Sequence, residues 1–189
     1  MTAGMSKHTF GSGVRLRKWR EGDAPVVLRA FRVPDLRDQV VLPVVTLQDA
    51  LGWMAAWEGV GHAFAVTVAH NGPVVGNVAV TGVDAHGNGL VSYWILPEAR
   101  RLGIAAAATD RLARWAFGKL GLFRLELVHR TNNPASCRVA TKAGFRVEGI
   151  ERRRAAGDGV GDGTGDGTGD GTGDGVGHDL ERHARLATD

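Results

Sequence analysis

The residues that most clearly predict chemistry lie at positions 96–105, where Leu-Pro-Glu-Ala-Arg-Arg-Leu-Gly-Ile-Ala joins an expected strand to an expected helix. The first turn of a helix carries backbone N–H groups with no partner inside the helix, and the positive end of the helix dipole. A phosphate or pyrophosphate binds well at such a place, and Gly103 lets the backbone approach it closely. Arg100 and Arg101 add positive charge. The stretch predicts a phosphate-binding loop, although an ordinary turn with solvated arginines has the same local pattern.

A second group of polar residues stands at the start of a later helix. Asn133 is placed to cap a helix that has Pro134 in its first position and ends near Lys142, before Gly144. Ser136 lies in the first turn of that helix. Cys137 follows it without a convincing histidine partner, so we expect a small core-facing residue and not a nucleophile.

The hydrophobic pattern predicts the elements that must position these residues. Strands are expected over residues 14–19, 63–69, 74–83, 90–96, 122–128, 145–154 and 179–187. Helices are expected over residues 24–32 with Asp23 as the cap, after a cap at Thr46, over residues 104–119, and over residues 134–142. The sequence therefore predicts a mixed α/β domain with six or seven strands and about four helices.

Length and composition limit the class of protein. The chain has 189 residues and a mass of 20.0 kDa, which is the size of one domain. Its apolar runs are too short to span a membrane and no secretory signal opens it, so we expect a cytoplasmic protein with no membrane partner. The single cysteine excludes an intramolecular disulfide and a multi-cysteine zinc site, and we expect no metal.

Residues 157–177 form a glycine-rich repeat with its own composition. The repeat alternates glycine with Asp, Thr or Val, holds 11 of the 28 glycines, and contains five acidic residues and no Lys or Arg. So much glycine with so little apolar surface predicts a disordered insertion in a single domain over residues 14–187, after a flexible arm over residues 1–13. The other 168 residues carry 23 basic and 15 acidic side chains, a formal net charge of +8, which favours a polyanionic partner.

Four segments in a fixed order resemble one enzyme superfamily. The pattern Arg100-x-x-Gly103-x-Ala105, after Tyr93-Trp-Ile-Leu-Pro, resembles the acetyl-CoA loop of GNAT N-acetyltransferases. The segments at residues 122–127 and 133–149 resemble the strand and helix that follow this loop, and residues 14–23 and 178–187 resemble the first and last strands. The resemblance covers residues 14–187 apart from the glycine tract. It implies a GNAT-like, mostly antiparallel central sheet of six to seven strands flanked by about four helices.

The resemblance also implies a co-substrate and the residues that contact it. Acetyl-CoA is expected against the end of one strand, the loop and the start of the later helix, at Ile95, Leu96, Arg100, Arg101, Leu102, Gly103, Ile104, Ala105, Asn133 and Ser136. Within the superfamily, Asn133-x-x-Ser136 is similar to the branch of ribosomal-protein N-terminal acetyltransferases (RimJ/RimL-like), and Ala140 stands where many GNAT enzymes have a tyrosine general acid. Ser136 is the implied catalytic residue, which hydrogen-bonds the thiolate or returns a proton to it.

Two positions depart from the family pattern. Arg101 stands where the usual loop has glycine, and Leu90 stands where this branch often has a glutamate that is a candidate base. A protein α-amine, with a pKa of about 7.7 to 8.0, needs less help from a base than a lysine amine near 10.4. The missing carboxylate therefore favours an N-terminal α-amine as acceptor, or a proton relayed through water. His86, Asp84 and Glu21 are expected to be solvated loop residues.

The expected reaction needs a neutral amine, a stabilised oxyanion and a thiolate that leaves. The resemblance implies that residues 93–96 offer backbone N–H groups to the thioester carbonyl, and that the amine attacks directly in a ternary complex. Alternatives are acetylation of a small-molecule amine and a catalytically weak acyl-CoA-binding or regulatory module. A nucleic-acid partner is not expected, because only Arg124 and residues 152–154 suggest a basic stripe. A homodimer whose partner completes the cleft is left open.

Overall fold

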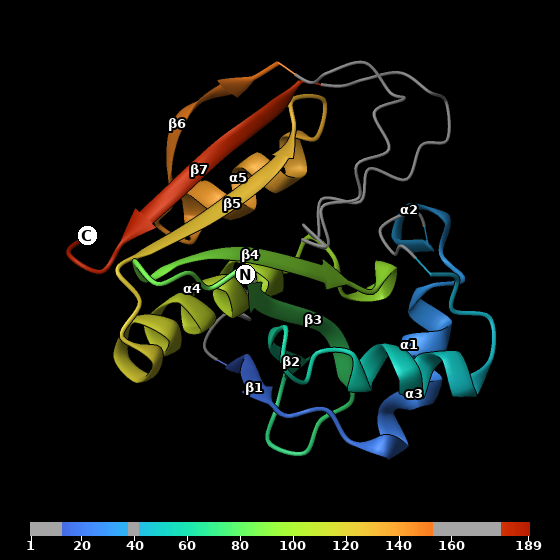
Figure 1. Cartoon of the computed structure of the whole chain (residues 1–189). Coiled ribbons are helices and arrows are strands. Elements are labelled where there is room, and N and C mark those ends of the chain that lie inside the picture. The colour runs from blue at the N-terminus through green and yellow to red at the C-terminus, as the bar shows by residue number, and fades with distance from the viewer. Residues whose placement is uncertain (1–12, 38–41, 153–178) are drawn as a thin grey trace, which may run out of the picture.

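A single seven-stranded sheet organises the chain, whose computed structural model describes residues 13–37, 42–152 and 179–189. The expected N-terminal arm, except for Gly13, and the glycine tract lie outside these residues. The strands are β1 (Arg15–Arg17), β2 (Gly61–Thr67), β3 (Val74–Thr81), β4 (Asn88–Ile95), β5 (Arg124–Arg130), β6 (Arg146–Glu151) and β7 (Leu180–Leu186), in the order β1-β2-β3-β4-β5-β7-β6 (Figure 1). The predicted mixed, mostly antiparallel sheet is confirmed.

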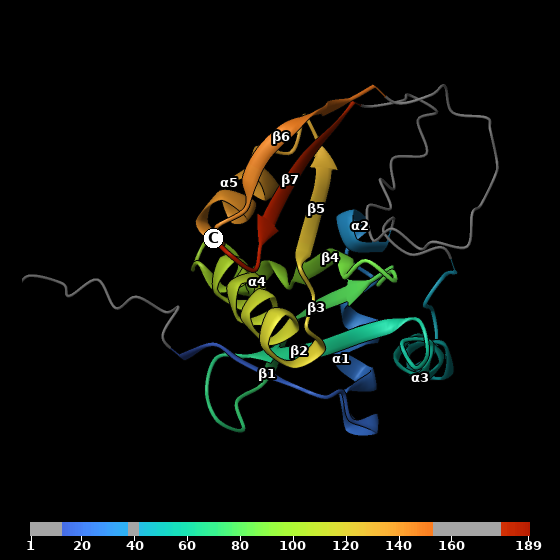
Figure 2. The ribbon, with the colours of Figure 1, turned by 60° about the vertical axis from the view of Figure 1, so that its left-hand side comes forward.

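The one parallel pairing among the described strands, between β4 and β5, shapes the middle of the sheet. These strands are paired only at their starts, from Asn88 opposite Arg124 to Leu90 opposite Glu126. Beyond this point β5 leaves β4 and continues beside β7, as the two views in Figures 1 and 2 show. The far ends of β4 and β5 therefore diverge. Side chains from β4 and from the elements that follow β5 meet beyond the paired part.

Helices cover both faces of the sheet. They are α1 (Ala24–Ala30), α2 (Pro34–Arg37), α3 (Leu47–Ala55), α4 (Ile104–Trp115) and α5 (Pro134–Lys142). The described part of the chain thus holds five α-helices, where about four were expected. We expected Pro34 only to interrupt the first helix, whereas it begins α2, because proline fits the first position of a helix, where no N–H partner is needed. The helix expected to run to Lys119 is α-helical to Trp115 and continues as a wider π turn over Ala116–Leu120.

Asp23 stands just before α1, as predicted for a cap, but the prediction that it caps this helix is wrong. The Asp23 carboxylate makes no capping bond to α1. It accepts hydrogen bonds of 2.6 and 2.8 Å from the Arg17 guanidinium and one of 2.9 Å from the Arg20 backbone amide. Asp23 therefore ties the end of β1 to the turn before α1. The cap at Thr46 is confirmed, because its hydroxyl accepts from the Asp49 amide.

Two hydrophobic clusters lie on the two sides of the sheet. One is built from strand residues together with α4 and α5, and it includes Ile104, Leu112 and Phe145. The other packs α1 and α3 against Trp94 and Leu96, and Trp53 belongs to it through ring contacts with four other aromatic side chains. Within the described residues, none of the helices is both long enough and apolar enough to cross a membrane.

Candidate functional site

The predicted phosphate loop forms a left-handed turn in front of α4. After β4, a single 3₁₀ turn over Pro97–Ala99 leads into the loop, in which Arg101 has a φ of 64° and Gly103 a φ of 77°. This conformation favours glycine, so the structure gives a physical reason for glycine in the usual loop where this chain has Arg101. Leu102 is 41% exposed, and both it and Arg101 lie on the surface.

The backbone amides at the start of α4 have no partners within the helix. The first bond across this turn runs from the Ala107 amide to the Gly103 carbonyl, 3.1 Å, and leaves the earlier amides without an intrahelical acceptor. Among the described residues, no atom lies within 4 Å of a Cβ added at Gly103, so this part of the structure leaves the space beside the loop open. Ile104 is 1% exposed and packs in the core, and Ala105 is partly buried against it. The helix start is thus anchored on one side and open on the other, as an anion site requires.

Two of the expected contact groups have other partners. The Arg100 side chain donates to the Ile95 carbonyl at 3.0 Å and pairs with Asp35 of α2 at 2.9 Å. It fastens the loop to the end of β4 and to α2. The Leu96 amide donates to the Val75 carbonyl at 2.9 Å, so it is not free for the thioester as we expected. The Ile95 and Leu96 side chains are buried.

A tyrosine that the sequence analysis left out joins the expected catalytic serine. The Tyr93 hydroxyl, from β4, lies 2.9 Å from the Ser136 hydroxyl, in the first turn of α5. This contact connects the diverging strands, because α5 follows β5 in the chain. Burial, partly offset by the bond to Ser136, raises the pKa of Tyr93, so the phenol keeps its proton at neutral pH. Neighbouring side chains of a strand point to opposite faces, so Tyr93 and Trp94 lie on different sides of the sheet. The sequence does not show which of these sides meets α5.

The start of α5 holds Ser136 in place. The Asn133 side-chain oxygen accepts from the Ser136 amide at 3.1 Å, which confirms the predicted cap, and Pro134 occupies the first turn. Ser136 is 8% exposed, and its backbone and hydroxyl are thus both bonded. Ser136 and Tyr93 therefore form a fixed pair of hydroxyls.

The polar turn before β4 has a structural role. Asp84 accepts from the backbone amides of His86 and Asn88, both at 2.9 Å, and from the Asn88 side chain. His86 is exposed in this turn. These contacts agree with the interpretation of Asp84 and His86 as loop residues, and neither meets the hydroxyl pair.

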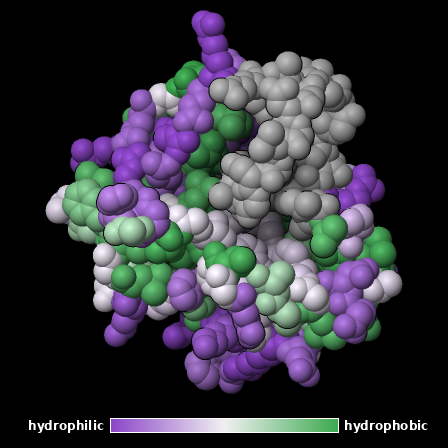
Figure 3. All heavy atoms as spheres, viewed as in Figure 1, coloured by the Kyte–Doolittle hydropathy of each residue, from purple (hydrophilic) through white to green (hydrophobic). Residues whose placement is uncertain are grey.

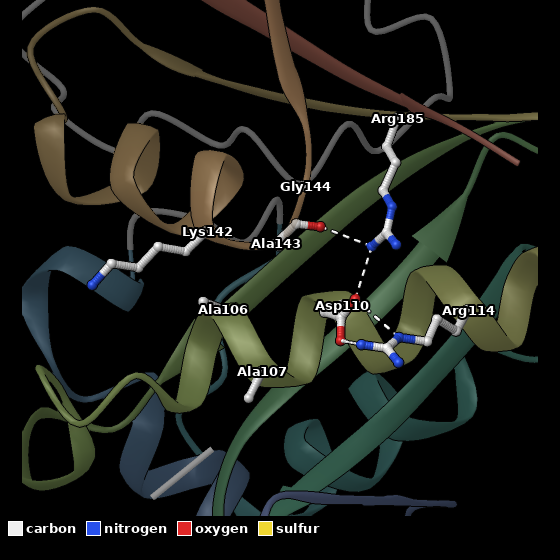
Figure 4. Close-up of a pocket in the computed structure, with 8 residues that line it drawn as sticks. All are labelled: Ala106, Ala107, Asp110, Arg114, Lys142, Ala143, Gly144 and Arg185. Carbon is white, nitrogen blue, oxygen red and sulfur yellow. Dashed lines mark hydrogen bonds and ion pairs between the residues drawn. The ribbon is translucent and has the colours of Figure 1, made fainter. Parts of the chain in front are cut away.

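A pocket of about 360 Å³ lies between α4 and the end of α5 (Figure 4). Arg185 donates to the Asp110 carboxylate at 2.9 Å and to the Ala143 carbonyl at 2.8 Å, and Asp110 also binds Arg114, whereas Lys142 points away from these residues. The full lining is Ala106, Ala107, Asp110, Arg114, Lys142, Ala143, Gly144 and Arg185. The lining begins at Ala106, about one helical turn after Gly103, and includes three basic side chains and one carboxylate.

Ion pairs occupy the outer face of β5 and β7, opposite α5. Arg124 pairs with Glu126 and Glu148, and Arg182 pairs with Glu126 and Glu151. Figure 3 shows hydrophilic residues interspersed with hydrophobic ones on this side of the molecule. Arg124, which suggested a nucleic-acid stripe, therefore has its charge balanced by carboxylates.

Comparisons with known proteins agree with this geometry. Residues 14–146 match the family model of the acetyltransferase (GNAT) domain. An uncharacterised N-acetyltransferase of Bacillus subtilis (strain 168), YoaA, is 37% identical over 68 residues, which are 36% of this chain and 38% of that protein. The match thus spans well under half of that relative.

Solved structures share the fold across nearly the whole chain. A GNAT-family acetyltransferase from Bacillus anthracis superposes with a TM-score of 0.75 at 18% identity, covering 93% of this chain and 96% of that one. The spermidine N-acetyltransferase of Vibrio cholerae, solved with CoA and spermine, gives a TM-score of 0.73 at 18% identity, covering 94% and 97%. At this identity the likeness is one of fold. With the family model matched over most of its length, the chain belongs to the GNAT acetyltransferase family.

Proposed function

We propose that this chain transfers the acetyl group of acetyl-CoA to a protein N-terminal α-amine, as a member of the RimJ/RimL-like branch. The observation that carries the proposal is the left-handed turn at Arg101 and Gly103, which leaves the first amides of α4 open on the side of the sheet where Tyr93 meets Ser136. The amides suit the pyrophosphate of CoA, and the hydroxyl pair suits its sulfur.

In the proposed reaction, the acceptor amine attacks the thioester, and the hydroxyl pair supplies the proton to the leaving thiolate. The lone pair of the neutral amine forms the C–N bond at the thioester carbonyl, and the C–S bond breaks as the thiolate leaves. The amine releases its extra proton to water. Ser136 hydrogen-bonds the departing sulfur, and Tyr93, protonated at neutral pH, supplies the proton through Ser136 or directly. Solvent then restores the proton of Tyr93.

The choice of acceptor class rests on charge. A polyamine is a multiple cation and binds best where unpaired carboxylates gather. Near the loop, however, the described carboxylates Asp35 and Glu98 are paired with Arg100 and Arg29. An α-amine carries one charge, and at pH 7 a useful fraction of it is already neutral. The Vibrio cholerae neighbour keeps a small polyamine as the second candidate acceptor.

The cofactor site is tested by a matched pair of glycine substitutions. Gly103 and Gly121 both have left-handed φ values, 77° and 69°, and neither has an atom within 4 Å of an added Cβ. Valine is therefore comparably strained at both positions, but only Gly103 lies in the loop. Acetyl-CoA at about 100 times its dissociation constant adds about 2.7 kcal/mol of stability, which raises the melting temperature by about 5 to 10 °C.

We expect this rise in the parent and in Gly121→Val, and its loss in Gly103→Val. Circular dichroism of both variants confirms that they fold. A parent protein that is folded and shows no rise at millimolar acetyl-CoA contradicts the proposal. An equal rise in melting temperature in both variants would mean that acetyl-CoA binds away from the loop.

The acceptor is tested by comparing three amines at one concentration of acetyl-CoA. They are a peptide with a free N-terminus, the same peptide with a blocked N-terminus and an internal lysine, and spermidine. We expect the highest kcat/KM for the free N-terminus. A preference for spermidine retains acetyl transfer but replaces the proposed acceptor with a small-molecule amine.

A further inference from the structure

Four potential metal ligands meet between α5 and the sheet, away from the hydroxyl pair. They are His129 on β5, Cys137 on α5, and Glu181 and His183 on β7, and their ligand atoms all lie within 4.8 Å of one another. His129 and Glu181 are directly opposite in the register of β5 and β7, and His183 follows Glu181 on the same face. Helix α5 lies against that face (Figure 1), and Cys137 reaches the cluster from it.

The separations of these atoms suit a tetrahedral ion. The two histidine Nε2 atoms are 3.0 Å apart, His183 Nε2 is 3.3 Å from Glu181 Oε1, and Cys137 Sγ is 3.9 Å from the same oxygen. A tetrahedral Zn²⁺, with Zn–N of about 2.0 to 2.1 Å and Zn–S of about 2.3 Å, sets its ligand atoms about 3.3 to 3.8 Å apart. These three separations lie within a few tenths of an ångström of the tetrahedral values, and the other pairs of ligand atoms, all within 4.8 Å, close by up to about 1 Å around the ion.

The tautomer of His129 agrees with ligation. His129 Nδ1 lies 2.8 Å from the Arg130 carbonyl oxygen, an acceptor only, so Nδ1 carries the proton and the Nε2 lone pair faces the cluster. His129 and His183 are 5% and 0% exposed.

Glu181 differs from the other well-covered carboxylates of the chain. Four carboxylates with side chains no more than about a quarter exposed each have an arginine partner: Asp23, Asp110, Glu126 and Asp189. The Glu181 side chain is 20% exposed, yet within the described ranges it contacts Cys137 and His183 and has no lysine or arginine partner. A cation among the four ligands supplies the missing positive charge.

We propose that His129, Cys137, Glu181 and His183 bind one Zn²⁺ ion. The site is closed, with four protein ligands from three elements, as in structural zinc sites. Its effect is to fasten α5 to β5 and β7 one residue from Ser136. The expectation of no metal rested on local sequence patterns, whereas these ligands are far apart in the sequence and meet only in the fold.

Cobalt is the direct probe, because Co²⁺ replaces Zn²⁺ and its spectrum reports sulfur ligation. The tag-free, reduced, chelator-treated protein is titrated with CoCl₂. We expect one equivalent to bind, with visible bands of tetrahedral cobalt and a sulfur-to-cobalt charge-transfer band. Cys137 is the only cysteine of the chain, so this band has one possible source. With ZnCl₂ at about 100 times its dissociation constant, we expect the melting temperature to rise by about 5 to 10 °C.

Three variants distinguish the proposed site from nonspecific metal binding. Cys137→Ser, nearly isosteric and partly exposed, is expected to lose the charge-transfer band and the thermal shift, and His183→Gln the tetrahedral bands. His86→Gln, the same change in an exposed turn, keeps both signals. The proposal is overturned if the folded parent shows no charge-transfer band at excess cobalt, or if zinc raises the melting temperature of Cys137→Ser as much as that of the parent. Neither readout depends on acetyl transfer.

Discussion

In the proposed reaction, the Tyr93 and Ser136 hydroxyls, 2.9 Å apart, handle the proton that the thiolate needs. Tyr93→Phe keeps the ring and its packing and removes only the donor. We expect kcat to fall about 100-fold, a usual value for a general acid, with little change in the KM for acetyl-CoA. Steady-state kinetics of the parent and the variant provide the measurement.

A double variant shows whether the two hydroxyls act as one unit. If they do, Tyr93→Phe with Ser136→Ala is hardly slower than the slower single variant. If the loss of kcat in the double variant is instead the product of the two single losses, the hydroxyls serve separate steps. A Tyr93→Phe enzyme with the parent kcat would remove Tyr93 from the chemistry.

Helix α5 is the element that positions the serine, and its first turn depends on one cap. Asn133 accepts from the Ser136 amide, so Asn133→Ala is expected to lower the free energy of unfolding by about 1 kcal/mol. Asn133→Asp retains an acceptor and is expected to remain close to the parent. Urea unfolding measures both. Equal losses in the two variants would show that the side-chain oxygen is not what stabilises the turn.

Local patterns predicted the elements well because their causes lie within a few residues. The caps at Thr46 and Asn133 each depend on neighbours in the sequence. The strands were predicted from the alternation of apolar and polar residues, and the loop before α4 was predicted from Gly103 and its neighbours. Helix α2 was missed because Pro34 both interrupts one helix and can begin another.

The site was predicted only in part because its contacts join distant residues. Tyr93 and Ser136 are 43 positions apart, and the turn of Arg100 toward Asp35 depends on how α2 packs. The partners of Asp23 likewise required the position of Arg17 on the first strand. The sequence placed the loop and the serine, whereas the tertiary structure decided which side chains meet them.

The folded molecule as a whole should lose stability in acid through its buried carboxylates. Burial alone raises the pKa of Asp23, but hydrogen bonds from Arg17 and the Arg20 amide outweigh it, and the pKa lies below its usual value. The unfolded chain therefore takes up this proton first as the pH falls. The contribution of Asp23 is complete at neutral pH and declines from about pH 4 downward, through the lower pKa of the folded state.

Asp23→Asn tests this linkage. The variant is expected to be less stable than the parent at pH 7, and the difference between them should shrink as the pH is lowered below about 4. Urea unfolding across that range gives both free energies. A difference that stays constant with pH would show that the charge of Asp23 is not what stabilises β1 against the turn before α1.

The central claim is that this molecule moves an acetyl group from acetyl-CoA to an amine, and the most direct measurement follows both products together. The protein is incubated with acetyl-CoA and a peptide with a free N-terminus, and free CoA thiol and acetylated peptide are quantified over time. We predict that the two products form at equal rates over many turnovers and that neither rate is seen without the protein. A folded protein that binds acetyl-CoA, yet forms neither product with this peptide, the lysine peptide or spermidine, would contradict the account and leave an acyl-CoA-binding module in its place.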